Sequence, residues 1–161
     1  MLTSLNALVG LPAVWQNQQV GWIERAVADV EGRRLGGLVV RKGMGSARWA
    51  DGNEVLCIGE NCVLLGSKPA RLPKVPPQKD RRTFLTTGEA AGVVTDVFFR
   101  GEPLALAALE VCRGPLQRLM GYRAYAADFC IRPGKVQDEV VAAQLLSWTQ
   151  LLSHLGEEGE P

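Results

Sequence analysis

The sequence predicts a mainly β protein, with two small β-barrels in tandem followed by a C-terminal amphipathic helix. Glycine and proline are abundant, with 18 Gly and 9 Pro in 161 residues, which favours many short strands joined by tight turns. The order of short apolar segments in the first half recurs in the second half, as in an internal duplication. A stretch rich in proline and basic residues separates the two halves.

The first barrel is expected over residues 1–67. Residues 20–28 mix apolar and polar side chains, as in a strand with one face in water. Residues 35–40 are apolar or glycine throughout, which is typical of a strand buried on both faces. Further short strands are expected near residues 48–50, and in a hairpin over residues 54–65.

The second barrel is expected over residues 83–137. Residues 92–99 match residues 21–28 in position and strand character, and residues 104–109 take the place of the buried strand at 35–40. The sequence identity between the halves is low, but the order of the elements is preserved, which indicates a duplicated unit.

Residues 110–123 are the stretch around which we expect the second half to be organised. They predict a strand, a break at Gly114 and Pro115, a single helical turn, and a second glycine, Gly121, that restarts extended chain.

Residues 68–82 form the predicted linker. They contain four prolines and six basic residues, and proline stiffens a chain toward the polyproline II conformation. We expect a semi-rigid basic linker, which either serves as a solvated spacer or contacts an acidic partner.

A helix is expected over residues 138–156, followed by an acidic tail at 157–161. Its apolar residues recur every three or four positions and so form one helix face: Val141, Leu145, Trp148, Leu152 and Leu155. Asp138 and Glu139 suit its N-terminal end, and Gly156 suits its C-terminal end.

The overall charge and the apolar segments limit the location and the partners. Eighteen basic residues against seventeen acidic ones give no strong field for non-specific binding of nucleic acid. No apolar run approaches the length of a membrane span, and no secretory signal opens the chain. We therefore expect a cytoplasmic protein whose four cysteines are reduced.

The residues that could carry chemistry are few. His154 is the only histidine and lies at the end of the predicted helix, so a capping or surface role is expected rather than catalysis. Cys57 and Cys62 are the nearest approach to a metal pair, but Cys112 and Cys130 lie in separate apolar strands. We expect no catalytic residue, no cofactor and no metal site.

Several glycine and apolar spacings resemble the PRC-barrel family, which includes the barrel of the photosynthetic reaction-centre H subunit and that of the ribosome maturation factor RimM. The resemblance covers residues 5–136. The segments that carry it in this sequence are residues 8–14, 20–23, 48–50, 55–65, 92–97, 110–116 and 121–123.

The tandem arrangement is most similar to two-module bacterial members of that family, some of them in spore-forming bacteria. RimM is less similar because its N-terminal half is a different barrel, and the H subunit carries a membrane helix. The second half of this chain lacks the Leu-x-Gly-x-Pro corner that opens the first. The resemblance implies a module that docks onto proteins or assembles complexes.

The functional hypothesis is therefore a non-enzymatic protein-binding or adaptor module. Its candidate interaction residues are Leu145, Trp148, Leu152, Trp22 and Trp49. An exposed helix face would also predict a homodimer through the C-terminal helix. The alternatives are a role linked to RNA or ribosome assembly, by analogy with RimM, and a regulator that binds a small ligand or a metal.

Overall fold

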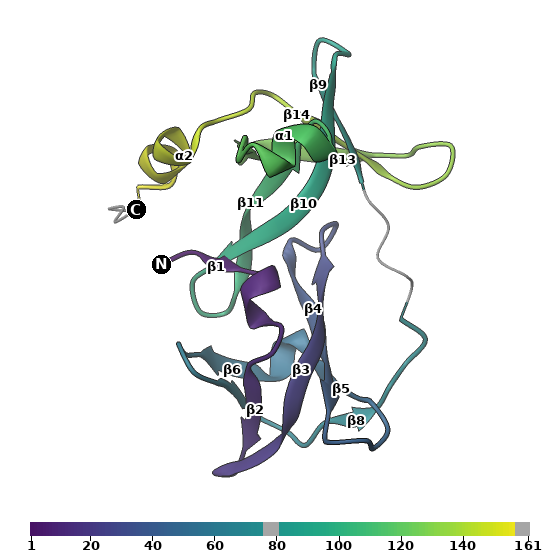
Figure 1. Cartoon of the computed structure of the whole chain (residues 1–161), viewed down its shortest axis with the longest axis vertical. Helices are drawn as coiled ribbons and strands as arrows, with labels where there is room; N and C mark the ends of the chain where they lie inside the picture. Colours follow the sequence, from purple (N-terminus) through teal and green to yellow (C-terminus); the bar gives the residue numbers. More distant parts are fainter. Residues whose placement is uncertain (76–80, 157–161) are drawn as a thin grey trace. The chain divides into compact units, whose positions relative to one another are not determined.

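The computed structural model describes residues 1–75 and 81–156, and it is mainly β with a C-terminal helix, as the sequence predicts (Figure 1). The strands are β1 (Thr3–Ser4), β2 (Pro12–Trp15), β3 (Gln18–Asp29), β4 (Arg34–Arg41), β5 (Arg48–Asp51), β6 (Val55–Ile58), β7 (Val63–Leu65), β8 (Ala70–Arg71), β9 (Arg82–Leu85), β10 (Ala90–Arg100), β11 (Ala105–Cys112), β12 (Ala124–Ala126), β13 (Phe129–Arg132) and β14 (Glu139–Ala142). The helices are η1 (Asn6–Leu8), η2 (Gly52–Glu54), α1 (Pro115–Leu119) and α2 (Trp148–Leu155).

The chain divides into two compact units. The N-terminal unit contains Leu2–Gln78 together with Phe99–Leu106, which is the tip of the β10–β11 hairpin. The C-terminal unit contains Lys79–Phe98 and Ala107–Pro161, as well as Met1. The tip of a hairpin from the second half of the chain thus belongs to the compact N-terminal unit.

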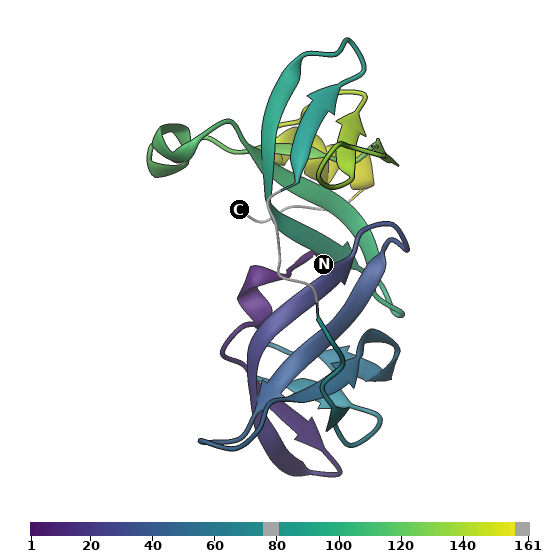
Figure 2. The same ribbon diagram turned by 90° about the vertical axis from the view of Figure 1, so that its right-hand side faces the viewer.

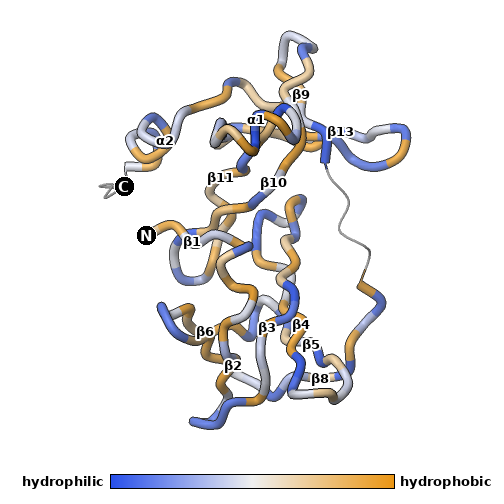
Figure 3. Tube along the Cα trace, viewed as in Figure 1, coloured by the Kyte–Doolittle hydropathy of each residue, from blue (hydrophilic) through white to orange (hydrophobic). Residues whose placement is uncertain are grey.

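In the N-terminal unit, the long hairpin β3–β4 pairs with β2 on one side and with β5 on the other. Strand β7 then pairs with β2 in parallel and with β6 in antiparallel orientation. The turn that joins β2 to β3 is hydrophilic, whereas the strands carry the apolar residues (Figure 3).

The C-terminal unit uses the same pairings. Strand β9 pairs with β10 and β12 with β11, both antiparallel, while β14 pairs with β9 in parallel and with β13 in antiparallel orientation. Six strands of the first half thus have an equivalent in the second, and β1 and β8 do not: β2 and β9, β3 and β10, β4 and β11, β5 and β12, β6 and β13, β7 and β14. This shared pattern supports the internal duplication that the sequence predicts.

A bulge glycine lies at the same place in both halves. Gly21 in β3 and Gly92 in β10 both have positive φ, 153° and 130°, at a register shift in the ladder. A Cβ on Gly21 would collide with the carbonyl group of Arg41, and a Cβ on Gly92 with that of Cys112. Glycine is required at both positions because the ladder strand approaches too closely for any side chain.

The described strands form one mixed sheet rather than two clearly closed barrels. Their hydrogen-bonded order is β13-β14-β9-β10-β11-β4-β3-β2-β7-β6, with β1, β5, β8 and β12 paired off this path. Within the described residues no pairing joins the end strands β13 and β6, so the sheet is open. The sequence predicts two small β-barrels in tandem. The strand pairing shows the coarser result, a mainly β fold, and does not clearly show two closed barrels.

The C-terminal helix is shorter than predicted. Residues 139–142 form strand β14, and α2 begins only at Trp148. A capping box between Ser147 and Gln150 opens it, and Gly156 closes it in the left-handed conformation. Asp138 and Glu139 are therefore not at its N-terminus, whereas the predicted role of Gly156 is confirmed.

Part of the predicted linker is ordered. Ala70–Arg71 forms β8, which pairs with β5, and Arg82 begins β9. The rest of the proline-rich stretch includes residues 76–80, which lie outside the described residues, as does the predicted tail at 157–161. Across residues 1–75 and 81–156, no helix is long and apolar enough to span a membrane.

Candidate functional site

Strand β11 and strand β12 are joined by an ordered loop, residues 113–123, that contains α1. Gly114 precedes the helix in an extended conformation, and Pro115 occupies its first turn, where a missing N–H costs nothing. Gly121, with φ of 80°, ends the turn. The sequence prediction of a strand, a Gly-Pro break, one helical turn and a glycine restart is confirmed.

Four apolar side chains of this loop are exposed, and we call them the α1 surface: Leu116, Leu119, Met120 and Tyr122. Their exposed fractions are 69%, 85%, 62% and 63%, and α1 has no buried residue. The first three are spaced by three and four residues and so share one face of the turn. In Figure 2 the green α1 loop extends away from the strands of its unit.

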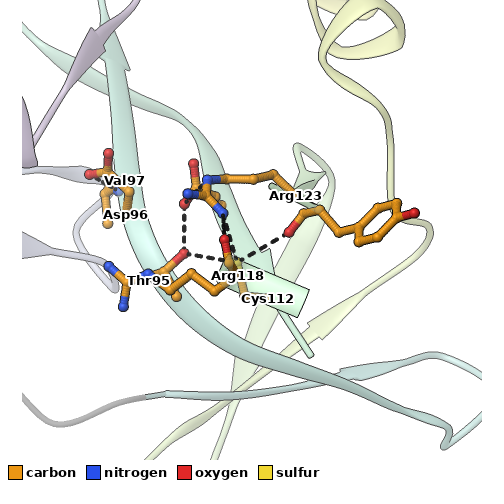
Figure 4. A network of polar contacts seen from close by, with 8 residues as sticks. Thr95, Asp96, Val97, Cys112, Arg118 and Arg123 are labelled. Atoms are coloured by element: carbon orange, nitrogen blue, oxygen red, sulfur yellow. Dashed lines mark hydrogen bonds and ion pairs between the residues drawn. The ribbon is translucent and has the colours of Figure 1, made fainter. Parts of the chain in front are cut away.

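The loop is fastened to the sheet through the buried Cys112. Its thiol donates to the carbonyl oxygen of Tyr122 at 3.7 Å and lies 3.7 Å from the hydroxyl of Thr95. The Arg123 guanidinium donates to the carbonyl oxygen of Arg118 at 3.4 Å and approaches the Cys112 sulfur at 3.9 Å (Figure 4). These contacts tie both the helical turn and the returning chain to β11.

Glu110 is the charged centre of this network. Its side chain is only 13% exposed, and its carboxylate accepts a hydrogen bond from the Thr95 hydroxyl at 2.7 Å. Arg123 Nε lies 3.5 Å from the same oxygen. Because a carboxylate this buried needs a partner, Arg123 both neutralises Glu110 and fixes the loop.

The neighbouring Tyr125 belongs to an aromatic cluster with Phe98 and Trp148, whose ring centroids lie 5.1–5.9 Å apart. Burial, followed by the charge of Glu110, raises the pKa of Tyr125. The cluster packs the start of α2 against β10 and β12.

The five candidate interaction residues from the sequence fall in two places. Trp148 lies in the aromatic cluster of the C-terminal unit, where Leu145 and Leu152 are partly exposed. In the N-terminal unit, Trp49 lies against Gly37, and Trp22 is 51% exposed. The structure therefore does not bring the five together as one surface within a single unit.

Potential ligands for a metal are dispersed. All four cysteines are free. His154 lies at the end of α2, and its Nε2 is 3.4 Å from a carboxylate oxygen of Asp128. Within the part of the chain that the structure describes, no three His, Cys, Asp or Glu side chains gather in a group that could hold a metal ion.

The sequence analysis missed the α1 surface, although it identified the stretch that forms it. The composition distinguishes this stretch only by its charge: residues 111–127 contain three arginines and no acidic residue, in a chain with a net charge of only +1. No protein-family model matches the chain, and no curated protein matches it either.

Proposed function

We propose that this protein is a non-enzymatic protein-binding or adaptor module, built from two PRC-type units, and that it docks through the α1 surface. The observation that carries the proposal is the exposure of four apolar side chains on an ordered loop. An apolar group of this kind on a folded protein is typical of an interaction site.

The composition of the loop supports a protein partner. Interface cores are enriched in aromatic residues such as Tyr, in Met and in Arg, and they are depleted of Lys, Glu and Asp. Residues 113–123 contain three Arg, two Leu, one Met and one Tyr, and no Lys, Glu or Asp.

The anchoring network supports the proposal in a second way. Hydrogen bonds from Cys112 and Arg123 tie the loop to β11 and to itself within the chain. A pre-ordered loop loses less conformational entropy on binding, so more of the contact energy is available for affinity.

The helix-mediated homodimer has less support. Trp148 contacts Phe98 and Tyr125 in its own unit, and Leu151 is fully buried. Much of the apolar face of α2 is therefore covered within the chain, which is why the proposal uses α1. The homodimer stays a prediction, which a change of solution mass in a Trp148→Glu variant would test.

RNA binding is the second candidate, and Phe84 is the residue that bears on it. The guanidinium groups of Arg82 and Arg132 lie 5.6 Å and 4.8 Å from its ring centroid. Binding of single-stranded RNA needs an aromatic face that is free to stack on a base. The arginines limit that access at Phe84, whereas Trp22 and Tyr122 are exposed. We favour a protein partner because Tyr122 belongs to an apolar surface.

The test is a cross-linking experiment at matched positions. A photo-cross-linkable residue at position 119 should capture a discrete protein in a native extract, with and without nuclease, whereas one at Met44 should not. Met44 is a suitable control because it is also fully exposed, in the loop that follows β4.

The captured protein should then be purified and its affinity measured. We expect Leu119→Asp to weaken binding at least roughly tenfold, because a charge would enter an apolar contact, and Met44→Asp to leave it unchanged. Equal effects of the two variants, or material that is lost on nuclease treatment, would contradict the proposal.

A further inference from the structure

A second apolar surface lies on the N-terminal unit, and we call it the β6–β7 surface: Glu54, Leu56, Glu60 and Leu64. Leu56 is 62% exposed and Leu64 is 41% exposed. A Cβ on Gly66 would lie 3.2 Å from both Leu56 Cδ2 and a Glu54 carboxylate oxygen, so these two side chains are neighbours. All four residues of β6 are hydrophobic (Figure 3).

The charge of this surface is opposite to that of the α1 loop. Residues 49–67 contain three acidic residues and no basic one, whereas residues 111–127 contain three arginines and no acidic residue. Glu54 and Glu60 are exposed, and within the described residues neither takes part in an ion pair.

On the α1 loop, two of the three arginines are already neutralised. Arg123 lies 3.5 Å from Glu110, and Arg113 lies 3.5 Å from Glu89. Arg118 is exposed and takes part in no ion pair among the described residues. It is therefore the cation that the loop offers to a partner.

We propose that the partner of the α1 surface is a second copy of this chain, whose β6–β7 surface it contacts. Leu119 would meet Leu56 and Leu64, while the adjacent Arg118 would face Glu54 and Glu60. This inference rests on the proposed function, because it names the partner of the same docking surface. Matching of apolar side chains together with opposite charges gives such a contact its specificity.

An anionic membrane fits the loop less well. Binding to lipid headgroups draws on clusters of four to eight basic residues, and of the three arginines of this loop only Arg118 takes part in no ion pair with the described residues. A single cation beside two carboxylates of a second copy is a closer match.

The contact has a recognisable geometry. The two surfaces are different patches of one chain, so the association is head-to-tail, and each added copy leaves both patches available for another. Because the patches are small, the association is weak and lies at the low end of protein interfaces.

Sedimentation velocity of the purified full chain over a concentration series tests this. At low salt the mean mass should rise with concentration beyond that of a dimer, and added salt should reduce it. Arg118→Glu, or Glu54→Arg with Glu60→Arg, should each weaken the association roughly tenfold. Combining all three changes in one chain should restore it.

Lys42→Glu is the matched control, because it reverses a charge in the equivalent loop of the first half and should leave the association unchanged. Circular dichroism of each variant shows whether it is folded. A monomer at every concentration, growth that stops at a dimer, or no recovery in the combined variant would overturn the inference. If the chain is monomeric while Leu119→Asp still loses a cross-linked protein and Met44→Asp does not, the docking function stands and only the second copy is wrong.

Discussion

The two halves of the chain share their strand pairings but differ in the loop that follows the central hairpin. After β4, residues 42–47 form a short loop in which one apolar side chain, Met44, is exposed. After β11, residues 113–123 contain a helical turn with four exposed apolar side chains. The shared strand pairing is thus a constant scaffold, and the two halves differ in a loop, which is where we propose that the function lies.

The same comparison explains how the longer loop is held. In the first half, the Arg41 guanidinium donates to the carbonyl oxygen of Gly45 at 2.8 Å and pairs with Glu24 at 3.1 Å, in an exposed position. When the two halves are aligned on the bulge glycines Gly21 and Gly92, Cys112 is the equivalent of Arg41 and Thr95 is the equivalent of Glu24. The second half thus has a partly buried polar network where the first half has an exposed ion pair, and this network can fix a larger loop.

The largest expected effect concerns the bulge glycines. Gly21→Ala and Gly92→Ala should each lower the free energy of unfolding by about 3 kcal/mol, because each Cβ would collide with ladder backbone at a positive φ. Gly10→Ala, also at positive φ but in open space, should cost only about 1 kcal/mol. Urea denaturation measures all three. Equal costs would show that the two bulges are not close-contact positions.

The next largest effect is expected at Glu110, in comparison with Glu24 in the first half. Glu110→Ala should cost about 1–2 kcal/mol, because it removes a partly buried carboxylate that both the Thr95 hydroxyl and Arg123 contact. Glu24→Ala removes only an exposed ion pair and should cost about 0.5 kcal/mol or less. Urea denaturation of the two variants checks this difference. A larger loss for Glu24→Ala would contradict the buried network.

A smaller effect, of opposite sign, is expected at Thr83. Its side chain is buried, and its hydroxyl has no hydrogen-bond partner among residues 1–75 and 81–156, whereas the equivalent residue of β2 is Ala13. Thr83→Val should therefore stabilise the protein by about 1 kcal/mol in thermal or urea unfolding. Thr95→Val, which removes a hydroxyl bonded to Glu110, should destabilise it. Destabilisation by both would mean that the Thr83 hydroxyl has a partner.

The smallest expected effect depends on pH. Tyr125 lies opposite Glu110 in the ladder, at the position that Trp49 occupies in the first half. Its pKa is raised above the usual 10.0, so the folded state holds the phenolic proton more tightly than the unfolded chain does. The contribution of Tyr125 to stability is then constant below pH 10 and decreases as the pH rises above it.

Tyr125→Phe should remove this part of the alkaline decline in stability. In a Tyr122→Phe variant, Tyr125 is the remaining tyrosine, so the absorbance of tyrosinate reports its titration directly. A midpoint at or below 10.0 would contradict the burial of its hydroxyl beside a carboxylate.

The sequence predicts well what depends on local chemistry. Gly114, Pro115 and Gly121 encode the strand, helical turn and restart of the α1 loop, and Gly156 encodes the end of α2. Val141 and Leu145 show the limit, because their spacing from Trp148 resembles a helix face. Residues 139–142 instead form β14, which pairs in parallel with β9, more than fifty residues away in sequence.

The internal repeat predicts a strand where the helical spacing alone predicts a helix. Strand β14 is the equivalent of β7, so extending the duplication past residue 137 predicts a strand there. The α1 surface could not be predicted in the same way, because Leu116, Leu119 and Met120 have the spacing of a helix face whether that face is buried or exposed. Only the fold shows that no other element of the described chain covers it.

The central claim is that the second half presents apolar side chains on a loop that is ordered in the free chain, whereas the first half does not. Amide hydrogen exchange of the full chain tests this most directly. The amides of Arg118, Met120, Gly121 and Tyr122 are hydrogen-bonded within the loop, whereas residues 42–47 have one such bond, from Gly45 to Lys42. We expect residues 118–122 to exchange more slowly than residues 42–47. Equally fast exchange of both loops would contradict the claim.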